Sequence, residues 1–290
     1  MIKIRKITKT FNDNEVLKGI DLDIQAGEIF GLIGKNGAGK TTLLSILAGL
    51  SDASSGDCYI NGYRISKTEK RANIGYLPDV PNFFDHMYVS EFLDYLYKSE
   101  DGYKQKRNEL IRLVGLDKHA MIKTLSRGMR QRLGLAAALV SDPDVLLLDE
   151  PSSALDPIGR YELSQILLEL KNQGKTIILS THILTDMENI CDRVGFLHNG
   201  TVVKTISHFS TQTTQKIKIV FSNPVDLSIF DKLPYDIVNE DKNVIILAGD
   251  FTNSEAQKEL LKRLYFINNV IINITALRTD LDAIFREICL

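Results

Sequence analysis

The chain has 290 residues, enough for about two domains and for a core that needs no disulfide or metal to stabilise it. Its composition, 44% hydrophobic and 25% charged, excludes long disorder, collagen and a pure coiled coil. Lys plus Arg number 35 and Asp plus Glu number 37, so the formal net charge is −2. The basic excess expected of a dedicated nucleic-acid-binding protein is therefore missing.

The cysteines and the apolar segments indicate where the chain works. Cys58, Cys191 and Cys289 are far apart and lack CxxC spacing, which argues against a disulfide framework or a zinc site and favours a reducing cytoplasm. The first residues run directly into an alternating pattern, without the apolar stretch of a signal peptide. No apolar run approaches about 18 residues, so we expect no membrane-spanning segment.

The first two thirds of the chain alternate between predicted strands and predicted helices. Apolar residues at positions 2, 4 and 7 predict an edge strand, and alternation predicts a second strand over 16–24. Apolar runs at 29–33, 145–148 and 176–180 are typical of strands buried on both faces of a parallel sheet. Ser90 is a plausible N-cap for one helix. The other helices are expected over 40–50, 110–114, 128–140 and 158–170.

The pattern changes after Gly200. A strand over 202–206 closes the first unit, and the polar segment 210–215 resembles a linker. Alternation then predicts strands over 216–221 and 244–247, and Ser254 is a candidate cap for a helix over 254–266. We therefore expect a small α+β appendix over 211–290. At its end, four apolar residues recur at helical spacing: Leu281, Ile284, Phe285 and Ile288.

One glycine-rich segment predicts a phosphate-binding loop between a buried strand and a helix. It matches the pattern G-x-x-x-x-G-K-[ST] in full, with glycines that let backbone N–H groups converge on an anion. The Lys40 ammonium can reach the β- and γ-phosphates of a nucleotide, and the Thr41 hydroxyl can bind Mg²⁺. The segment consists of Gly34, Lys35, Asn36, Gly37, Ala38, Gly39, Lys40 and Thr41.

Two carboxylates follow a buried strand at the sheet edge where ligands of parallel sheets bind. Asp149 suits the coordination of Mg²⁺, and Glu150 can accept a proton from an attacking water. By itself the pair is equally typical of a solvated strand end, and the phosphate-binding loop favours catalysis. His182 ends the next strand at the same edge. It either faces the γ-phosphate or has a structural role, which is usual for a lone histidine.

The segment Leu125-Ser126-Arg127-Gly128-Met129 resembles the signature sequence of ATP-binding cassette (ABC) ATPases, commonly written LSGGQ. Ser126 and Gly128 match it, whereas Arg127 and Met129 depart from it, as is often seen in drug- and peptide-exporter members. Ser126 is also a plausible helix N-cap. The order of all the motifs in the chain carries the resemblance, which covers residues 1–205.

The resemblance implies a P-loop NTPase cassette over 1–205, with a mixed, mainly parallel core sheet, an antiparallel β edge and a helical lobe at about 80–140. It also implies further contacts with ATP. Thr42 matches a position that supports the α-phosphate, and Asp156 matches the D-loop, which the family places at the dimer interface. Phe11 lies where the family has an aromatic that stacks on adenine, and a core position is the equal alternative.

Asp79 stands where the family usually has Gln. Aspartate is one methylene shorter, carries a negative charge and lacks the amide donor, but it can still bind Mg²⁺ through a water. The alternative is a loop residue that merely follows Pro78. We therefore expect an altered site residue at this position.

By resemblance, the signature belongs to the nucleotide site of the opposite protomer, so a complete site needs two chains and closes around Mg-ATP. The partner cassette is identical or a related chain. The aromatic segment 80–97 resembles the region that cradles the coupling helix of a membrane subunit. Phe83, Phe84 and Met87 are candidate docking residues, with core positions in the lobe as the alternative.

The motifs together predict the ATP-hydrolysing subunit of an ABC exporter, bound through a separate transmembrane permease to the cytoplasmic face of the membrane. It resembles the ATPase subunits of bacterial exporters of amphipathic, modulin-type peptides, and drugs, peptides or lipids are the expected substrates. The alternative is a soluble ABC ATPase of translation or DNA repair. Two features disfavour that alternative: the chain has a single cassette, and Lys40 and Asp149 are only 109 residues apart. The missing basic excess also disfavours it, together with any nucleic-acid partner.

Two further alternatives concern the activity of the chain and the role of its terminal helix. A pseudo-ATPase that only binds ATP is disfavoured because Lys40, Glu150 and His182 are all present. The apolar residues of the terminal helix either pack on their own domain, which is the favoured interpretation, or contribute to dimerisation.

Overall fold

The computed structural model describes residues 2–66, 68, 73–97, 103–182, 184, 190–207, 215–241, 243–249, 251, 254–267, 270–277, 284–285 and 288. The chain forms two compact units. One comprises Met1–Ser207 with Phe285–Leu290, and the other comprises His208–Ile284. The predicted linker residues 210–214 lie outside the described residues.

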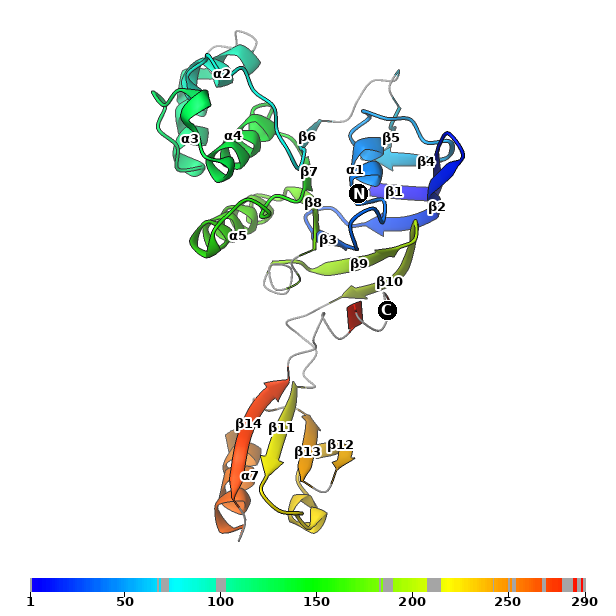
Figure 1. Ribbon diagram of the computed structural model, residues 1–290, viewed down its shortest axis with the longest axis vertical. Coiled ribbons are helices and arrows are strands. Elements are labelled where there is room, and N and C mark those ends of the chain that lie inside the picture. The colour runs from blue at the N-terminus through cyan, green and yellow to red at the C-terminus, as the bar shows by residue number, and fades with distance from the viewer. Residues whose placement is uncertain are drawn as a thin grey trace. The chain divides into compact units, whose positions relative to one another are not determined.

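A six-stranded, mainly parallel sheet lies at the centre of the first unit (Figure 1), in the order β10-β9-β3-β8-β7-β6. Only β10 runs antiparallel, to β9, and every residue of β3, β7 and β8 is buried. The predicted mixed sheet is thus confirmed. Its strands are β3 (Ile29–Ile33), β6 (Ile74–Leu77), β7 (Val145–Asp149), β8 (Thr176–Thr181), β9 (Arg193–His198) and β10 (Thr201–Ser207).

A second, antiparallel sheet has the order β2-β1-β4-β5. The prediction that the first strand is an edge strand is wrong, because β1 pairs with β2 on one side and β4 on the other. The sequence of β4 is too polar to be recognised as a strand, so the second partner of β1 was missed. The strands of this sheet are β1 (Ile2–Phe11), β2 (Asn14–Ile24), β4 (Ser55–Ile60) and β5 (Tyr63–Arg64).

The helix α1 (Lys40–Leu47) joins the two sheets through one hydrophobic core. Ile2 and Ile4 of the antiparallel sheet, Leu43 of α1 and Leu147 of the parallel sheet belong to the same cluster and are at most 1% exposed. The segment that begins at the phosphate-binding loop is therefore held from both sides by buried side chains.

A helical lobe extends the parallel sheet on the side of β6 (Figure 1). The prediction that Ser90 caps its first helix is wrong, because the helix begins at Val89 and Tyr88 is the N-cap. Glu91 at the third helical position accepts a hydrogen bond from the Tyr88 backbone N–H at 2.9 Å. The lobe contains α2 (Val89–Leu96), α3 (Tyr103–Leu113), η1 (Ile122–Thr124) and α4 (Arg127–Leu139), and α5 (Pro157–Asn172) follows β7.

The described residues of the second unit form a four-stranded antiparallel sheet with one α-helix and one short 3-10 helix, as predicted for the α+β appendix. Side chains of α7 (Ser254–Phe266) and of the sheet form its core, in which Ile219, Phe221 and Leu260 are buried. The strand order is β12-β13-β11-β14. The remaining elements are β11 (Gln215–Phe221), η2 (Leu227–Phe230), β12 (Tyr235–Asp241), β13 (Val244–Gly249) and β14 (Ile271–Leu277).

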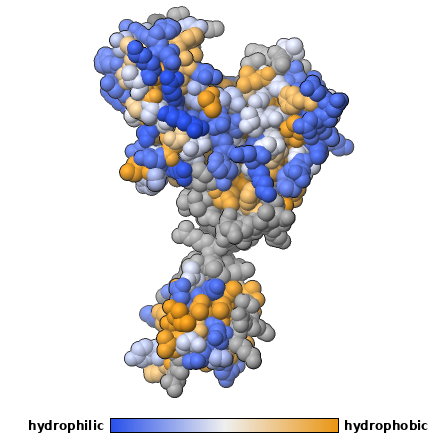
Figure 2. Space-filling view, viewed as in Figure 1, coloured by the Kyte–Doolittle hydropathy of each residue, from blue (hydrophilic) through white to orange (hydrophobic). Residues whose placement is uncertain are grey.

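The two edge strands of this sheet differ in charge. The edge strand β12 carries Asp236, Glu240 and Asp241, whereas β14 has no charged residue and exposes Ile272. Figure 2 shows hydrophobic residues on the visible face of this unit.

Of the predicted terminal helix, Leu281 lies outside the described residues, and the other three apolar residues are half-buried.

Two expectations concern the environment of the chain. None of the helices in the described ranges is both long and apolar enough to cross a membrane. Cys58 and Cys191 are buried, and Cys289 lies outside the described residues. Burial raises the pKa of Cys58 to about 11, so this thiol is a poor nucleophile at neutral pH.

We expect Leu147→Ala to lower the free energy of unfolding of the first unit by about 2–5 kcal/mol, because Leu147 is fully buried between the two sheets. Urea unfolding measures the loss. Ile158→Ala is the control, since Ile158 is 70% exposed and its truncation should change stability by about 0.5 kcal/mol or less. Equal losses in the two variants would contradict the assignment of the core.

Candidate active site

The carboxyl ends of three neighbouring parallel strands meet at one edge of the central sheet. Ser180 of β8 is in register with Asp149 of β7, and Thr181 of β8 is in register with Ile33 of β3. The loops that follow these strands therefore begin side by side, as expected for a ligand site in a parallel sheet.

The phosphate-binding loop connects β3 to α1, as predicted. Gly37 and Gly39 have φ of 83° and 108°, in the region that favours glycine. A Cβ at Gly39 would lie 2.6 Å from Leu17 Cδ2. Among the described residues, no side chain caps α1, and the first turn of α1 has no acidic residue. Its first backbone N–H groups and its dipole are therefore available to an anion. Asn36, Gly37 and Thr41 are exposed, Thr42 is half-buried, and Ala38 is buried.

The Lys40 ammonium is only 6% exposed and lies inside the loop. Its Nζ donates to the Gly34 carbonyl at 2.8 Å and to the Lys35 carbonyl at 3.4 Å. It also pairs with Glu150 Oε1 at 3.3 Å. The positive charge of the loop is thus joined directly to the predicted catalytic carboxylate.

The Glu150 side chain lies between a cation and a histidine. Its Oε1 faces Lys40, and its Oε2 lies 2.8 Å from His182 Nδ1. Glu150 is 9% exposed, whereas the His182 side chain is 52% exposed. The structure therefore brings together the three residues that the sequence assigns to hydrolysis, with the histidine on the solvent side.

Asp149 is fully buried at the end of β7. Its Oδ1 accepts a hydrogen bond from Ser180 Oγ at 2.6 Å, and its Oδ2 has no hydrogen-bond partner among the described residues. A buried carboxylate oxygen without a partner is unfavourable unless a cation or a donor compensates it. This oxygen is therefore suited to a metal ion.

Asp79 lies just beyond β6, the strand next to β7, and accepts a hydrogen bond from Ser153 Oγ at 3.3 Å. Burial raises the pKa of the Tyr76 phenol, the charges of Asp149 and Asp79 raise it further, and a hydrogen bond to Ser45 acts in the opposite direction. The charges of Asp149 and Asp79 thus both raise the pKa of the Tyr76 phenol, which shows that the two carboxylates lie near the same side chain. Their common location fits a site for Mg²⁺, a hard cation that prefers oxygen ligands.

The signature segment and the D-loop of the same chain lie close together in space. Ser126 is the N-cap of α4, and its Oγ accepts a hydrogen bond from the Met129 N–H at 3.2 Å. A Cβ at Gly128 would lie 3.1 Å from the Ala154 carbonyl oxygen. Asp156 is the N-cap of α5, and its Oδ1 accepts a hydrogen bond from the Gly159 N–H at 2.8 Å. The capping role of Ser126 is therefore confirmed.

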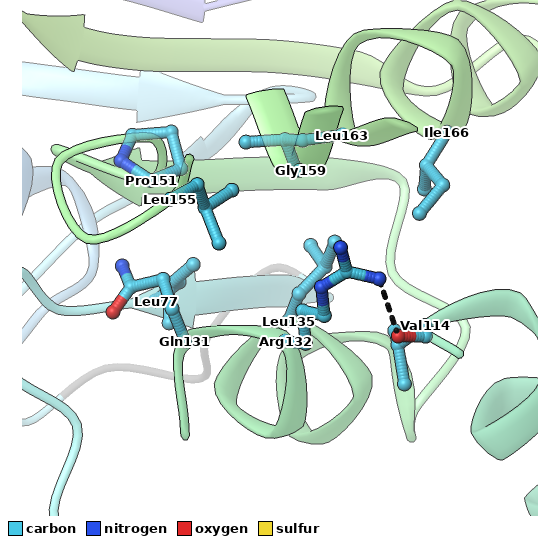
Figure 3. A pocket seen from close by; sticks show the side chains of 10 residues that line it. All are labelled: Leu77, Val114, Gln131, Arg132, Leu135, Pro151, Leu155, Gly159, Leu163 and Ile166. Atoms are coloured by element: carbon cyan, nitrogen blue, oxygen red, sulfur yellow. Dashed lines mark hydrogen bonds between the residues drawn. The ribbon is translucent and has the colours of Figure 1, made fainter. Parts of the chain in front are cut away.

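A small cavity lies between α4 of the lobe and α5 (Figure 3). Its volume of about 10 Å³ is enough for about one water molecule. Arg132 of α4 pairs with Glu162 of α5 and donates to the Val114 carbonyl at 3.4 Å. The cavity also contains the amide of Gln131, which is only 3% exposed. Polar contacts thus connect the signature helix to the helix that follows the D-loop.

Phe11 is 49% exposed, so the alternative of a core position is wrong. The Lys9 ammonium lies 4.8 Å from the centre of its ring. An exposed aromatic ring at the end of β1 is available for stacking, but its contact with adenine stays a prediction.

Sequence reasoning missed two serines and one backbone conformation. Ser153 contacts Asp79, and Ser180 contacts both Asp149, the last residue of β7, and Glu150, which follows it. Glu150 has a left-handed φ of 49°. The available signal for Ser180 was a hydroxyl next to an apolar strand run, but its partners depend on the register between strands.

Comparisons with known proteins identify the family of the chain. The ABC transporter family model matches residues 17–153. An uncharacterized ABC transporter ATP-binding protein of Synechocystis is 46% identical over 64% of the chain, an alignment that spans only 55% of that relative. The lantibiotic transport ATP-binding protein SrtF of Streptococcus pyogenes is 32% identical over 80% of the chain and 99% of its own length.

A solved structure, a dimer of the ATP-binding cassette MJ0796 in a post-hydrolysis state bound to ADP and Pi, matches with a TM-score of 0.66. It is 26% identical and covers 71% of this chain and 98% of its own. The chain belongs to the ATP-binding subunits of ABC transporters, a family of ATP-hydrolysing cassettes.

We expect Asp156→Ala to lower the free energy of unfolding by about 0.5–2 kcal/mol, because it removes the side-chain cap of α5. Asp156→Asn keeps an oxygen acceptor at the same place and should differ from the wild type by only a few tenths of a kcal/mol. Thermal unfolding of the two variants without nucleotide measures the difference. Equal destabilisation by Asn and Ala would show that charge, not capping, is the contribution of this residue.

Proposed function

We propose that the chain is the ATP-hydrolysing subunit of an ABC exporter. In this proposal it binds Mg-ATP between two protomers and powers the efflux of peptides, drugs or lipids through a separate transmembrane permease. The chain would then lie at the cytoplasmic face of the membrane, held there by the permease. The observation that carries the proposal is the position of Glu150 between Lys40 and His182, beside the phosphate-binding loop.

The chemistry of hydrolysis follows from this arrangement. The Glu150 carboxylate would accept the proton of the attacking water, and its contact with His182 holds one carboxylate oxygen in a fixed direction. Lys40 and the first N–H groups of α1 would neutralise charge on the phosphates. Binding of the phosphates would draw Lys40 away from Glu150, because one ammonium cannot fully satisfy both.

The residues present fit a Mg²⁺ ion. The unpartnered Oδ2 of Asp149 supports direct or water-mediated coordination, and the Thr41 hydroxyl and Asp79 would complete the oxygen ligands. When bound, Mg²⁺ supplies charge neutralisation at the phosphates. The shorter Asp79, already bonded to Ser153, supports a water-mediated contact in place of the direct contact of a glutamine.

A second cassette would complete the site. Ser126 and Gly128 stand at the start of α4 in the helical lobe, whereas Lys40 starts α1 in the core. Each chain therefore contributes one phosphate-binding loop and one signature, and Asp156 would lie near the protomer interface. The dimeric structure of the related cassette supports this arrangement.

An exposed aromatic cluster supports contact with a permease. Phe84 is 47% exposed and Tyr95 is 63% exposed, and their rings meet edge to face at 5.8 Å. Phe83 instead packs against Phe92 at 5.1 Å and is half-buried, as is Met87. We therefore assign permease contact to Phe84 and Tyr95, and a packing role to Phe83.

Two observations support export as the direction of transport. The relative SrtF is named a lantibiotic transport protein, and the signature carries the exporter-like Arg127 and Met129. Amphipathic peptides are therefore the substrate class that we favour among peptides, drugs and lipids. The near-zero net charge offers no support for a nucleic-acid partner.

We expect Glu150→Gln to lower kcat for ATP hydrolysis by about 10²–10⁴-fold, because the amide cannot accept the proton of water. ATP binding should persist, and light scattering should detect a dimer that ATP stabilises. Phosphate release and nucleotide affinity are measured on the same preparations. Glu169→Gln is the matched control, because Glu169 is exposed at the far end of α5. Undiminished phosphate release by the Glu150 variant would refute its role as the base.

The permease contact is tested by detergent pull-down from membranes of the source cell. We expect the wild type to recover a polytopic membrane protein, and Phe84→Ala with Tyr95→Ala to recover several-fold less, since both rings are exposed. Tyr161→Ala on α5, also an exposed aromatic, is the control and should recover the wild-type amount. Recovery of ribosomes in place of a membrane protein would favour a role in translation.

A further inference from the structure

Ser180 is a fully buried polar residue at the centre of the active-site edge. It is the next-to-last residue of β8, 0% exposed, and is in register with Asp149 of β7 on one side and Leu32 of β3 on the other. The four residues of β8 that precede it, 176–179, are also buried. A hydroxyl at such a position must form hydrogen bonds within the protein or destabilise the fold.

The Ser180 hydroxyl joins the two acidic residues at the carboxyl end of β7: Asp149, the last residue of the strand, and Glu150, the next residue. As a donor, it bonds to Asp149 Oδ1 at 2.6 Å, and as an acceptor, it receives the Glu150 backbone N–H at 3.0 Å. One side chain thus uses both of its hydrogen-bonding functions on the proposed metal ligand and the proposed base.

The first bond sets the direction of the Asp149 carboxylate. Because Oδ1 is occupied by the serine, the unpartnered oxygen is Oδ2. Rotation of the carboxylate about its last bond would break a short hydrogen bond in a buried environment, where such bonds are strong. The serine therefore fixes which oxygen is presented to a cation.

The second bond supports an unfavourable backbone conformation. Glu150 has φ of 49°, which is rare for a residue with a side chain. Its N–H is directed at Ser180 Oγ, and its side chain is directed at Lys40 and His182. Without the serine, the turn could relax toward negative φ and carry the Glu150 carboxylate out of these contacts.

We propose that Ser180 is a positioning residue for ATP hydrolysis, which orients Asp149 toward the metal ion and holds the Glu150 backbone in its left-handed turn. It acts through these two residues and needs no contact with the nucleotide. The inference rests on the proposed roles of Asp149 and Glu150, and nothing in the signature enters it.

The test uses three substitutions in the full-length chain: Ser180→Ala, Ser180→Thr and Ser180→Val. Thr and Val have nearly the same shape and add the same bulk to a buried site, but only Thr keeps a hydroxyl. The difference between them isolates the hydrogen bonds from the effect of packing. Alanine removes the hydroxyl without adding bulk, so that it remains informative if both larger side chains prevent folding.

Five quantities are measured for each variant: kcat and KM for ATP, the melting temperature, nucleotide affinity in EDTA, and Mn²⁺ affinity. Mn²⁺ serves as the metal probe, and electron paramagnetic resonance detects its binding in the presence of a non-hydrolysable ATP analogue. The metal measurement does not depend on turnover. Affinity in EDTA reports on the phosphate-binding loop alone.

We expect Ser180→Ala and Ser180→Val to lower kcat and Mn²⁺ affinity by about 10–100-fold each, which is usual when a residue that orients a metal ligand is removed. Nucleotide affinity in EDTA should be unchanged. Ser180→Thr should restore most of kcat and of Mn²⁺ affinity relative to Ser180→Val at an equal melting temperature.

The inference is wrong if Thr and Val are equally impaired, or if Ala leaves kcat and Mn²⁺ affinity at the wild-type values. A purely structural role would lower the melting temperature of Ala while sparing both quantities. The Glu150→Gln variant separates this failure from that of the proposed function. If Glu150→Gln retains turnover, the assignment of Glu150 as the base fails. If Glu150→Gln loses turnover while Ser180→Ala stays fully active, only the proposed role of Ser180 is wrong.

Discussion

The parallel pairing of β3, β8 and β7 is the constraint on which the rest of the site depends. The three strands are buried over their whole length, so their register is fixed by packing on both faces. That register places the ends of the strands at one edge. Lys40 and His182, far apart in the chain, both contact Glu150 only because these strands end together.

Much of the fold was predictable because its strands have distinct patterns. Continuous apolar runs identified β3, β7 and β8, and alternation identified β2 and β11. The failures have a common cause, which is a contact with a distant or unrecognised segment. The first strand was assigned to an edge because its partner β4 has a polar sequence. The start of α2 was misplaced because Glu91 bonds to the backbone of Tyr88, which is not a usual capping residue.

The sequence predicted the individual motifs of the site, but not the contacts between them. The glycine loop and the two carboxylates carry their chemistry in local spacing, so Lys40, Asp149 and Glu150 were found from the sequence alone. The exposed position of Phe11 and the contact between His182 and Glu150 needed the structure. The hydrogen bonds of Ser180 were not predictable, since they depend on the register of two strands and on the positive φ of Glu150.

The edge strand β14 has a practical consequence for handling the protein. Its sequence is uncharged and rich in isoleucine, and Ile272 and Ile274 are 64% and 47% exposed. Among the described residues β14 pairs only with β11, and apolar edge strands of this kind pair with strands of other molecules, whereas the exposed Asp236 on β12 opposes such pairing at the other edge. Concentrated samples are therefore prone to self-association through β14, and a lysine at position 272 is a suitable way to keep them monodisperse without altering the core.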